Sequence, residues 1–122
     1  MQALTASDKV RTVTIGIERY CVLVSRWADN YPAVRRVWLY GSRVVGTCRA
    51  DSDLDVAVEL DDRALRGEKH FVWWMYESPA MKAVLAGMID VVPHIQLYEP
   101  DAIEVISGVA EHGLLVYDAR CK

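Results

Sequence analysis

The stretch YGSRVVGTCRADSDLDVAVEL, from Tyr40 to Leu60, decides the fold that the sequence predicts. From Ser52 to Leu60 polar and apolar residues alternate, so Asp53 and Asp55 share one side and the Leu and Val residues share the other. This period of two indicates a half-buried β-strand, with the two aspartates about 6.5 to 7 Å apart at their Cα atoms. Such like charges repel unless a cation neutralises them, and Mg²⁺ characteristically takes one or two protein carboxylates. The strand therefore predicts a metal site.

A Gly-Ser pair stands at the start of the same stretch. Residues Arg36 to Tyr40 indicate a strand, because they are rich in aromatic and β-branched residues, and a short helical turn is expected from Arg43 to Val45. At the junction, Gly41 lets a polyphosphate approach the backbone, and Ser42 can cap the turn or donate to a phosphate oxygen. Alone, each motif is explained by a turn or a solvated strand face, but their ordered combination favours a phosphate site beside metal carboxylates.

In this order of motifs the chain resembles the DNA polymerase β-like nucleotidyltransferase superfamily, and most closely its minimal, MNT antitoxin-like nucleotidyltransferases. The resemblance is carried by Gly41-Ser42, a spacer of ten residues, and Asp53-Leu54-Asp55. Arg43, Gly46 and Arg49 also match the way such proteins read across this region. The resemblance implies transfer of a nucleoside monophosphate from a nucleoside triphosphate to a hydroxyl, with release of pyrophosphate and with ATP as the expected donor.

The resemblance also assigns roles to residues. Asp53 and Asp55 are expected to hold Mg²⁺, in a site with two ions. The phosphates are expected to lie against Gly41 and Ser42, and Arg43 and Arg49 to neutralise phosphate charge.

A third acid is expected on a strand from Met88 to Ile95. Asp90 stands there among apolar residues, where a carboxylate is costly unless a metal, a donor or a reacting proton satisfies it. In the resembled family a third carboxylate from such a strand is a metal ligand or the general base, and Asp90 matches it. The alternative is a carboxylate bonded to backbone N–H groups. His94 is expected at the surface or behind the ligands, since the predicted site is all oxygen.

The rest of the chain predicts an α/β (α+β) domain over residues 1–122: a small mixed β-sheet with helices packed on one face and the site at its exposed edge. Apolar spacing predicts a core helix from Ser7 to Asn30. Caps and periodicity then predict a helix over 63–77 with Phe71, Trp74 and Met75 in the core, a helix over 79–87, a helix over 101–112 with Ile103 on its apolar face, and a short strand over 114–117.

Composition narrows the class of protein. A net charge of −3 and a pI near 5.5 disfavour a nucleic-acid partner, which selects for clustered Lys and Arg. The three cysteines show no paired spacing, which favours a reducing compartment. No signal peptide and no apolar run near ~20 residues is present in the sequence, so we expect a cytoplasmic protein without a membrane span.

The acceptor is predicted from what the chain lacks. The nucleotide-binding core accounts for nearly every residue, so one wall of the site is expected to be open or supplied by another chain. In the resembled minimal family that partner is often a HEPN-type toxin, modified on a tyrosine. Trp73, Tyr76 and Trp38 are the residue types that anchor interfaces. Three alternatives remain open: a homo-oligomer, an antitoxin that acts sterically with weak or no transfer, and a stand-alone small-molecule nucleotidyltransferase.

Overall fold

The computed structural model describes residues 6–121, with side chains from Gly16 to Arg120. Four strands, β1 (Val34–Tyr40), β2 (Leu54–Leu60), β3 (Pro93–Leu97) and β4 (Leu114–Asp118), form one sheet in the order β3-β2-β1-β4. The β1–β2 and β1–β4 pairs are antiparallel and the β2–β3 pair is parallel. The sheet is therefore small and mixed, as the sequence predicts.

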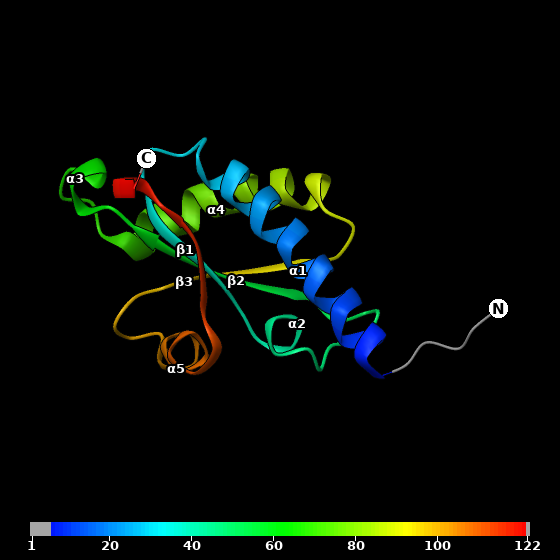
Figure 1. Ribbon diagram of the computed structural model, residues 1–122. Helices are drawn as coiled ribbons and strands as arrows, with labels where there is room; N and C mark the ends of the chain where they lie inside the picture. The colour runs from blue at the N-terminus through cyan, green and yellow to red at the C-terminus, as the bar shows by residue number, and fades with distance from the viewer. Residues whose placement is uncertain (1–5, 122) are drawn as a thin grey trace.

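The two long helices, α1 (Ala6–Ala28) and α4 (His70–Met88), lie side by side on one face of this sheet (Figure 1). They cover the apolar side of the alternating strand β2, where Leu54, Val56 and Val58 are fully buried. Trp27 of α1 is also fully buried, and its indole N–H donates to the carbonyl of Met81 in α4, 2.9 Å away. Burial of this face supplies the main driving force for folding.

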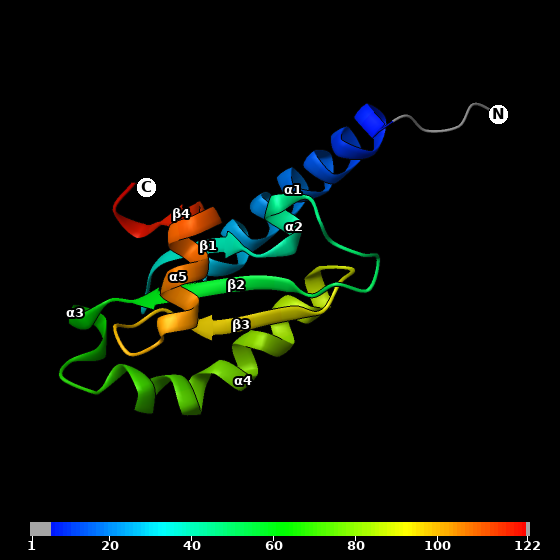
Figure 2. The ribbon, with the colours of Figure 1, turned by 90° about the horizontal axis from the view of Figure 1, so that it is seen from below.

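Helix α5 (Ile103–His112) lies against the opposite face of the sheet, as the view from below shows (Figure 2). A Cβ built on Gly108 would come within 2.7 Å of the Tyr40 ring, so glycine permits this close approach to β1. The expected apolar face of this helix is only partly right. Val105 is buried, whereas Ile103 is 73% exposed at the start of the helix.

The expected break between two helices at Ser78-Pro79 is wrong. A short helix α3 (Asp62–Leu65) comes first, and α4 then runs without interruption through Pro79. Its buried residues, Trp74, Ser78, Met81 and Leu85, follow one stripe across the proline. Packing of this stripe on the sheet and α1 therefore outweighs the about 3 kcal/mol that an interior proline costs a helix.

Two residues expected in the core of this region lie outside it. Phe71 is 58% exposed and Met75 is 57% exposed, whereas Trp74 is buried as predicted. The sequence misleads here because α4 is apolar on every side, so its periodicity does not identify the face that packs.

The strand expected over 88–95 begins later than predicted. Helix α4 continues to Met88, and β3 runs from Pro93 to Leu97. Asp90 therefore lies in a bend between helix and strand, and its side chain is 60% exposed. Its apolar neighbours in the sequence, Ile89, Val91 and Val92, predicted a strand, but they belong to the connection between α4 and β3.

Candidate functional site

The Gly-Ser turn lies where β1 ends and α2 (Ser42–Val45) begins, as predicted. Gly41 has φ 81° and ψ −160°, a backbone conformation that is essentially confined to glycine. Its carbonyl accepts the backbone N–H groups of Val44 and Val45, each at 3.1 Å, which closes the turn. The N-cap of α2 is Gly41, which has no side chain, and Ser42 is the first residue of the helix. The turn therefore presents Gly41 and Ser42 at the end of a rigid strand.

Asp55 lies directly beside this turn. The antiparallel register pairs Tyr40 with Asp55, which brings the carboxylate in front of Gly41. A Cβ on Gly41 would collide with Oδ2 of Asp55, so any other residue there would displace the carboxylate. The candidate phosphate turn and the candidate metal ligand therefore meet at one point, although thirteen residues lie between Gly41 and Asp55 in the chain.

Asp53 is exposed and stands one residue before β2, at the end of the loop over 46–53. Arg43 braces this loop. Its Nε donates to the carbonyl of Ser52 at 2.9 Å, and its Nη2 donates to the carbonyls of Ala50 and Arg49 at 3.2 and 3.4 Å. The observed contacts of Arg43 thus position the loop that carries Asp53, and its contact with phosphate stays a prediction. Arg49 is exposed on the same loop.

Asp90 has partners on α1. The Tyr20 hydroxyl donates to Asp90 Oδ1 at 2.7 Å, and Arg19 Nη1 lies 3.7 Å from Oδ2. The hydrogen bond from Tyr20 is the main reason that the pKa of Asp90 is lowered, with smaller contributions from Arg19 and Arg43. The carboxylate is therefore ionised at neutral pH. Burial, and then Asp90, raise the pKa of Tyr20, so its hydroxyl remains a donor.

Asp90 borders a cavity of about 450 Å³, whose walls come from Ala50 to Ser52 and from Ile89 to Val92. One wall is the loop that leads into Asp53, and the other is the bend that leads into β3. A hydrogen bond of 2.9 Å from the Leu54 N–H to the Val92 carbonyl joins the two walls. The structure thus places Asp90 across this cavity from residues 50–52, in a bend and not within the strand, and among the described residues it does not gather Asp90 with Asp53 and Asp55 into one metal-binding group.

His94 lies next to Asp55. The sequence predicted that His94 is not itself a metal ligand, and it did not predict this contact. The parallel register pairs Asp55 with His94, and His94 Nδ1 lies 3.2 Å from Asp55 Oδ1. Gln96 Nε2 lies 3.0 Å from His94 Nε2, and the Tyr40 hydroxyl lies 3.4 Å from Gln96 Oε1. His94 and Gln96 are two residues apart, so on a strand they lie on the same face. The sequence could have indicated that they lie near Asp55 only if the register between β2 and β3 had been known.

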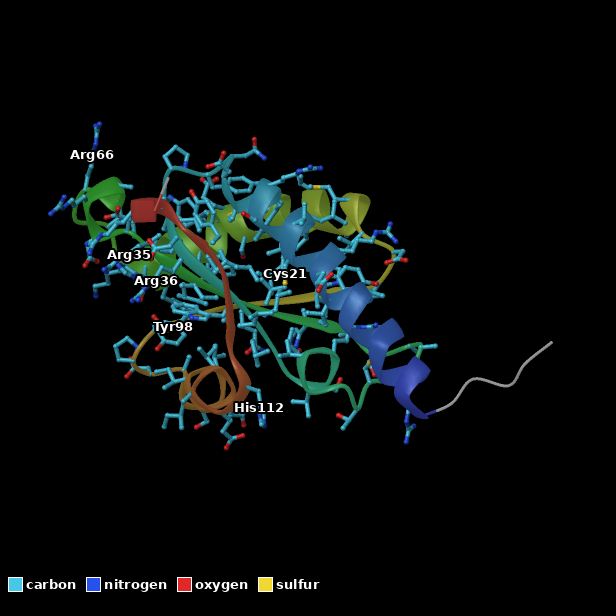
Figure 3. All side chains as sticks on the ribbon, viewed as in Figure 1. Cys21, Arg35, Arg36, Arg66, Tyr98 and His112 are labelled. Carbon is cyan, nitrogen blue, oxygen red and sulfur yellow. The ribbon has the colours of Figure 1, made fainter. Side chains whose placement is uncertain are left out.

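The expected interface aromatics differ in exposure. Tyr76 is 76% exposed on α4, beside the exposed Met75 and Val72. Trp73 instead packs against the core, and Trp38 stacks on Tyr98 with ring centroids 4.5 Å apart. Figure 3 shows Tyr98 close to Arg36, whose guanidinium pairs with Glu59. Of the three predicted aromatics, Tyr76 is therefore the one that is largely exposed.

A profile of the family described as polymerase β, nucleotidyltransferase matches residues 24–119. This chain therefore belongs to the polymerase β-like nucleotidyltransferase family, as the Gly-Ser and Asp-x-Asp motifs predict. No curated protein sequence matches it.

Solved structures share the fold at low sequence identity. A toxin–antitoxin crystal structure with AMP-PNP has a TM-score of 0.61 and 20% identity, over 82% of this chain and 74% of the other. The toxin–antitoxin structure MntA-HepT has a TM-score of 0.52 and 17% identity, over 88% and 74%. A nucleotidyltransferase candidate from Sulfolobus solfataricus has a TM-score of 0.54 and 15% identity, over 98% and 94%. These neighbours share the fold of the chain over most of its length.

Family membership implies a divalent metal, and the donor set allows one. Among residues 16–120 no three His, Cys, Asp or Glu side chains gather around one point. Asp53 and Asp55 supply carboxylate oxygens at the end of β2, and Gly41 leaves space for the second of them. Two carboxylates suit Mg²⁺, because that ion commonly takes its other ligands from water and substrate phosphates. The residues present therefore fit a cation that is completed by its substrate.

Proposed function

We propose that this protein transfers a nucleoside monophosphate from a nucleoside triphosphate, with ATP as the donor, to a hydroxyl group. The observation that carries this proposal is that the Asp55 carboxylate packs against Gly41, because this contact brings the proposed phosphate-binding turn and the proposed metal ligand together. In the reaction the acceptor oxygen bonds to the α-phosphorus, the bond to the bridging oxygen breaks, and pyrophosphate leaves. This reaction belongs to the nucleotidyltransferase type of phosphorus-group transfer.

Each site residue has a proposed task. Asp53 and Asp55 hold Mg²⁺, which when bound neutralises phosphate charge and polarises the attacked phosphoryl group. Gly41 and Ser42 bind the outer phosphates at the turn, and Arg49 reaches them from the exposed loop. Arg43 keeps that loop in place through its bonds to three carbonyls and adds positive charge beside it.

Asp90 is proposed to orient the acceptor hydroxyl and to accept its proton. It borders the 450 Å³ cavity that leads to the loop before Asp53, so an acceptor in this cavity would meet it. The lowered pKa of Asp90 makes the carboxylate a weak base, so orientation is the larger part of this role.

A protein is the proposed acceptor, specifically a tyrosine of a HEPN-type toxin. Two of the neighbouring structures are toxin–antitoxin complexes, which supports a partner of this kind. The outward face of α4 carries exposed apolar side chains at Val72, Met75 and Tyr76, which suits a protein contact. The same face would serve an antitoxin that acts sterically.

No helix within residues 6–121 has the length and apolar character to cross a membrane. Cys21 and Cys48 are free thiols, which supports a reducing, cytoplasmic setting.

The test is co-expression with the neighbouring reading frame, followed by incubation with each of four labelled nucleoside triphosphates and Mg²⁺. We expect intact-mass spectra to show the partner gaining one or more nucleoside monophosphates, with ATP preferred. An Asp55→Asn variant provides the control for background labelling. A partner that binds without gaining mass would contradict transfer and support an antitoxin that acts sterically. Labelling of a small molecule alone would contradict a protein acceptor and support a small-molecule nucleotidyltransferase.

A further inference from the structure

Three polar side chains on neighbouring strands form a chain that ends on Asp55. Tyr40 belongs to β1, Gln96 and His94 belong to β3, and Asp55 lies between them on β2. The separations are 3.4 Å from Tyr40 Oη to Gln96 Oε1, 3.0 Å from Gln96 Nε2 to His94 Nε2, and 3.2 Å from His94 Nδ1 to Asp55 Oδ1. All four residues therefore share one face of the sheet and one end of it.

The chemistry of the groups gives these bonds one direction. An amide nitrogen only donates, so Gln96 Nε2 donates to His94 Nε2, which must accept. The proton of the His94 ring then lies on Nδ1, and Nδ1–H donates to Asp55 Oδ1. Burial, followed by the charges of Asp55 and Glu104, raises the pKa of Tyr40 to about 12, so its hydroxyl stays protonated and donates to Gln96. Each donor therefore points toward the carboxylate.

The two oxygens of Asp55 have different surroundings. Oδ1 faces His94 on β3, whereas Oδ2 occupies the space in front of Gly41 that a Cβ would fill. A carboxylate held by one oxygen presents the other in a fixed orientation. Here the second oxygen is turned toward the Gly-Ser turn, where a cation shared with the phosphates would lie.

We propose that His94 is a positioning residue whose Nδ1–H holds Asp55 Oδ1, so that Oδ2 is presented to a divalent cation, and that Gln96 and Tyr40 set its tautomer. The proposal rests on the proposed nucleotidyl transfer, because it assigns Asp55 to the metal. Removing a residue that hydrogen-bonds to a metal ligand typically lowers metal affinity by about 10- to 100-fold. Both ring nitrogens of His94 are engaged, so it acts through Asp55 and does not bind the cation.

The experiment measures Mn²⁺ binding by electron paramagnetic resonance, with AMP-PNP present, for the parent protein and for two substitutions of His94. His94→Leu removes the donor, and we expect a loss of affinity of about 10- to 100-fold. His94→Asn places an amide N–H near the position of Nδ1, and we expect it to restore most of the affinity. His94 is about half exposed, so both variants should fold, and melting temperatures without ligand check this.

Two further variants make the result specific. His112→Leu is the matched control, because His112 is exposed at the last turn of α5 (Figure 3). Gln96→Leu leaves the imidazole in place but removes the group that sets its tautomer, so we expect a smaller loss than for His94→Leu. If His94→Leu does not fold, Gln96→Leu decides the question, and parental affinity in that variant overturns the proposal.

The outcomes separate this proposal from the proposed function. If the parent protein binds no Mn²⁺ in the presence of AMP-PNP, the metal assignment fails, and with it both proposals. If the parent binds and His94→Leu binds equally well, the role of His94 is overturned while the proposed function stands. A folded His94→Asn that is as weak as His94→Leu overturns it as well, because the N–H donor is then not what holds Asp55.

Discussion

Asp55 and Asp90 are acids of the same type that the sequence assigned to one site, and the fold gives them different surroundings. Asp55 lies within a strand, half-buried, between Gly41 at the turn that follows one neighbouring strand and His94 on the other neighbouring strand. Asp90 lies in a bend, exposed, and its partners Tyr20 and Arg19 come from a helix. The difference teaches that a carboxylate held by strand register has a fixed direction, whereas one at a bend depends on a few side chains.

The largest expected effect is that of Asp55→Asn. We expect it to reduce transfer by at least about 100-fold, because a neutral amide in this fixed position binds a divalent cation poorly. We also expect Mg²⁺ with AMP-PNP to raise the melting temperature of the parent, since a ligand at 100 times its Kd stabilises a fold by about 2.7 kcal/mol, and this shift to vanish in the variant. Without ligand the variant should be as stable as the parent, because a like-charge repulsion is relieved. An unchanged ligand-induced shift would show that Asp55 does not hold the metal.

We expect Gly41→Ala to have the second-largest effect on metal binding, because the substitution displaces the Asp55 carboxylate without changing its charge. The added Cβ meets Oδ2 of Asp55, and the backbone of Gly41, with φ 81° and ψ −160°, lies in a region essentially confined to glycine, which costs a further ~1 to 3 kcal/mol. Gly46→Ala is the control, since Gly46 also has a positive φ, of 92°, but open space around the added Cβ. We expect both variants to lose thermal stability from backbone strain and Gly41→Ala alone to lose Mn²⁺ binding. Equal Mn²⁺ affinities would mean that the contact with Asp55 has no functional effect.

Asp90→Asn is expected to have a smaller effect on binding than on transfer. Because Asp90 borders the cavity and not the Gly-Ser turn, nucleotide affinity should stay near that of the parent while transfer falls. Asp51→Asn, on the opposite wall of the same cavity, controls for a general change of charge. Rates and nucleotide affinities measured together decide the role. If binding and transfer fall in parallel, Asp90 contributes to the metal site, and near-parental transfer would exclude it from the chemistry.

The smallest effect concerns the hydrogen bond between Tyr20 and Asp90. Tyr20→Phe removes the main cause of the lowered pKa of Asp90, so carboxyl NMR titration should show that pKa rising toward its ordinary value. A lowered pKa stabilises the folded protein above the ordinary pKa of aspartate, and this contribution disappears as the pH falls through the folded value. The part of the stability difference due to Asp90 should therefore be present at neutral pH and lost in acid. Tyr98→Phe, at the other end of β3, should leave the Asp90 titration unchanged.

Much of the fold follows from local pattern. The alternation of β2 predicted both the strand and the side that is buried, and the apolar spacing before residue 30 predicted α1 within two residues at its C-terminal end. The continuous helix through Pro79 could not be predicted in this way, because the proline signal is local and the packing of Trp74 and Met81 that overrides it is not. The position of Asp90 was missed for the same reason, since an apolar run does not distinguish a strand from a bend that packs on the core.

By itself the sequence determined the Gly-Ser turn, the acidic strand and the family to which they belong, because these features are set by residue order over short distances. Only the tertiary structure decided which groups surround Asp55. Strand register is a property of two chain segments at once, and it brought Gly41, His94 and Tyr40 to one carboxylate across up to 39 positions of the chain. The same register left Asp90 outside the sheet, because β3 begins only where its backbone can pair with β2.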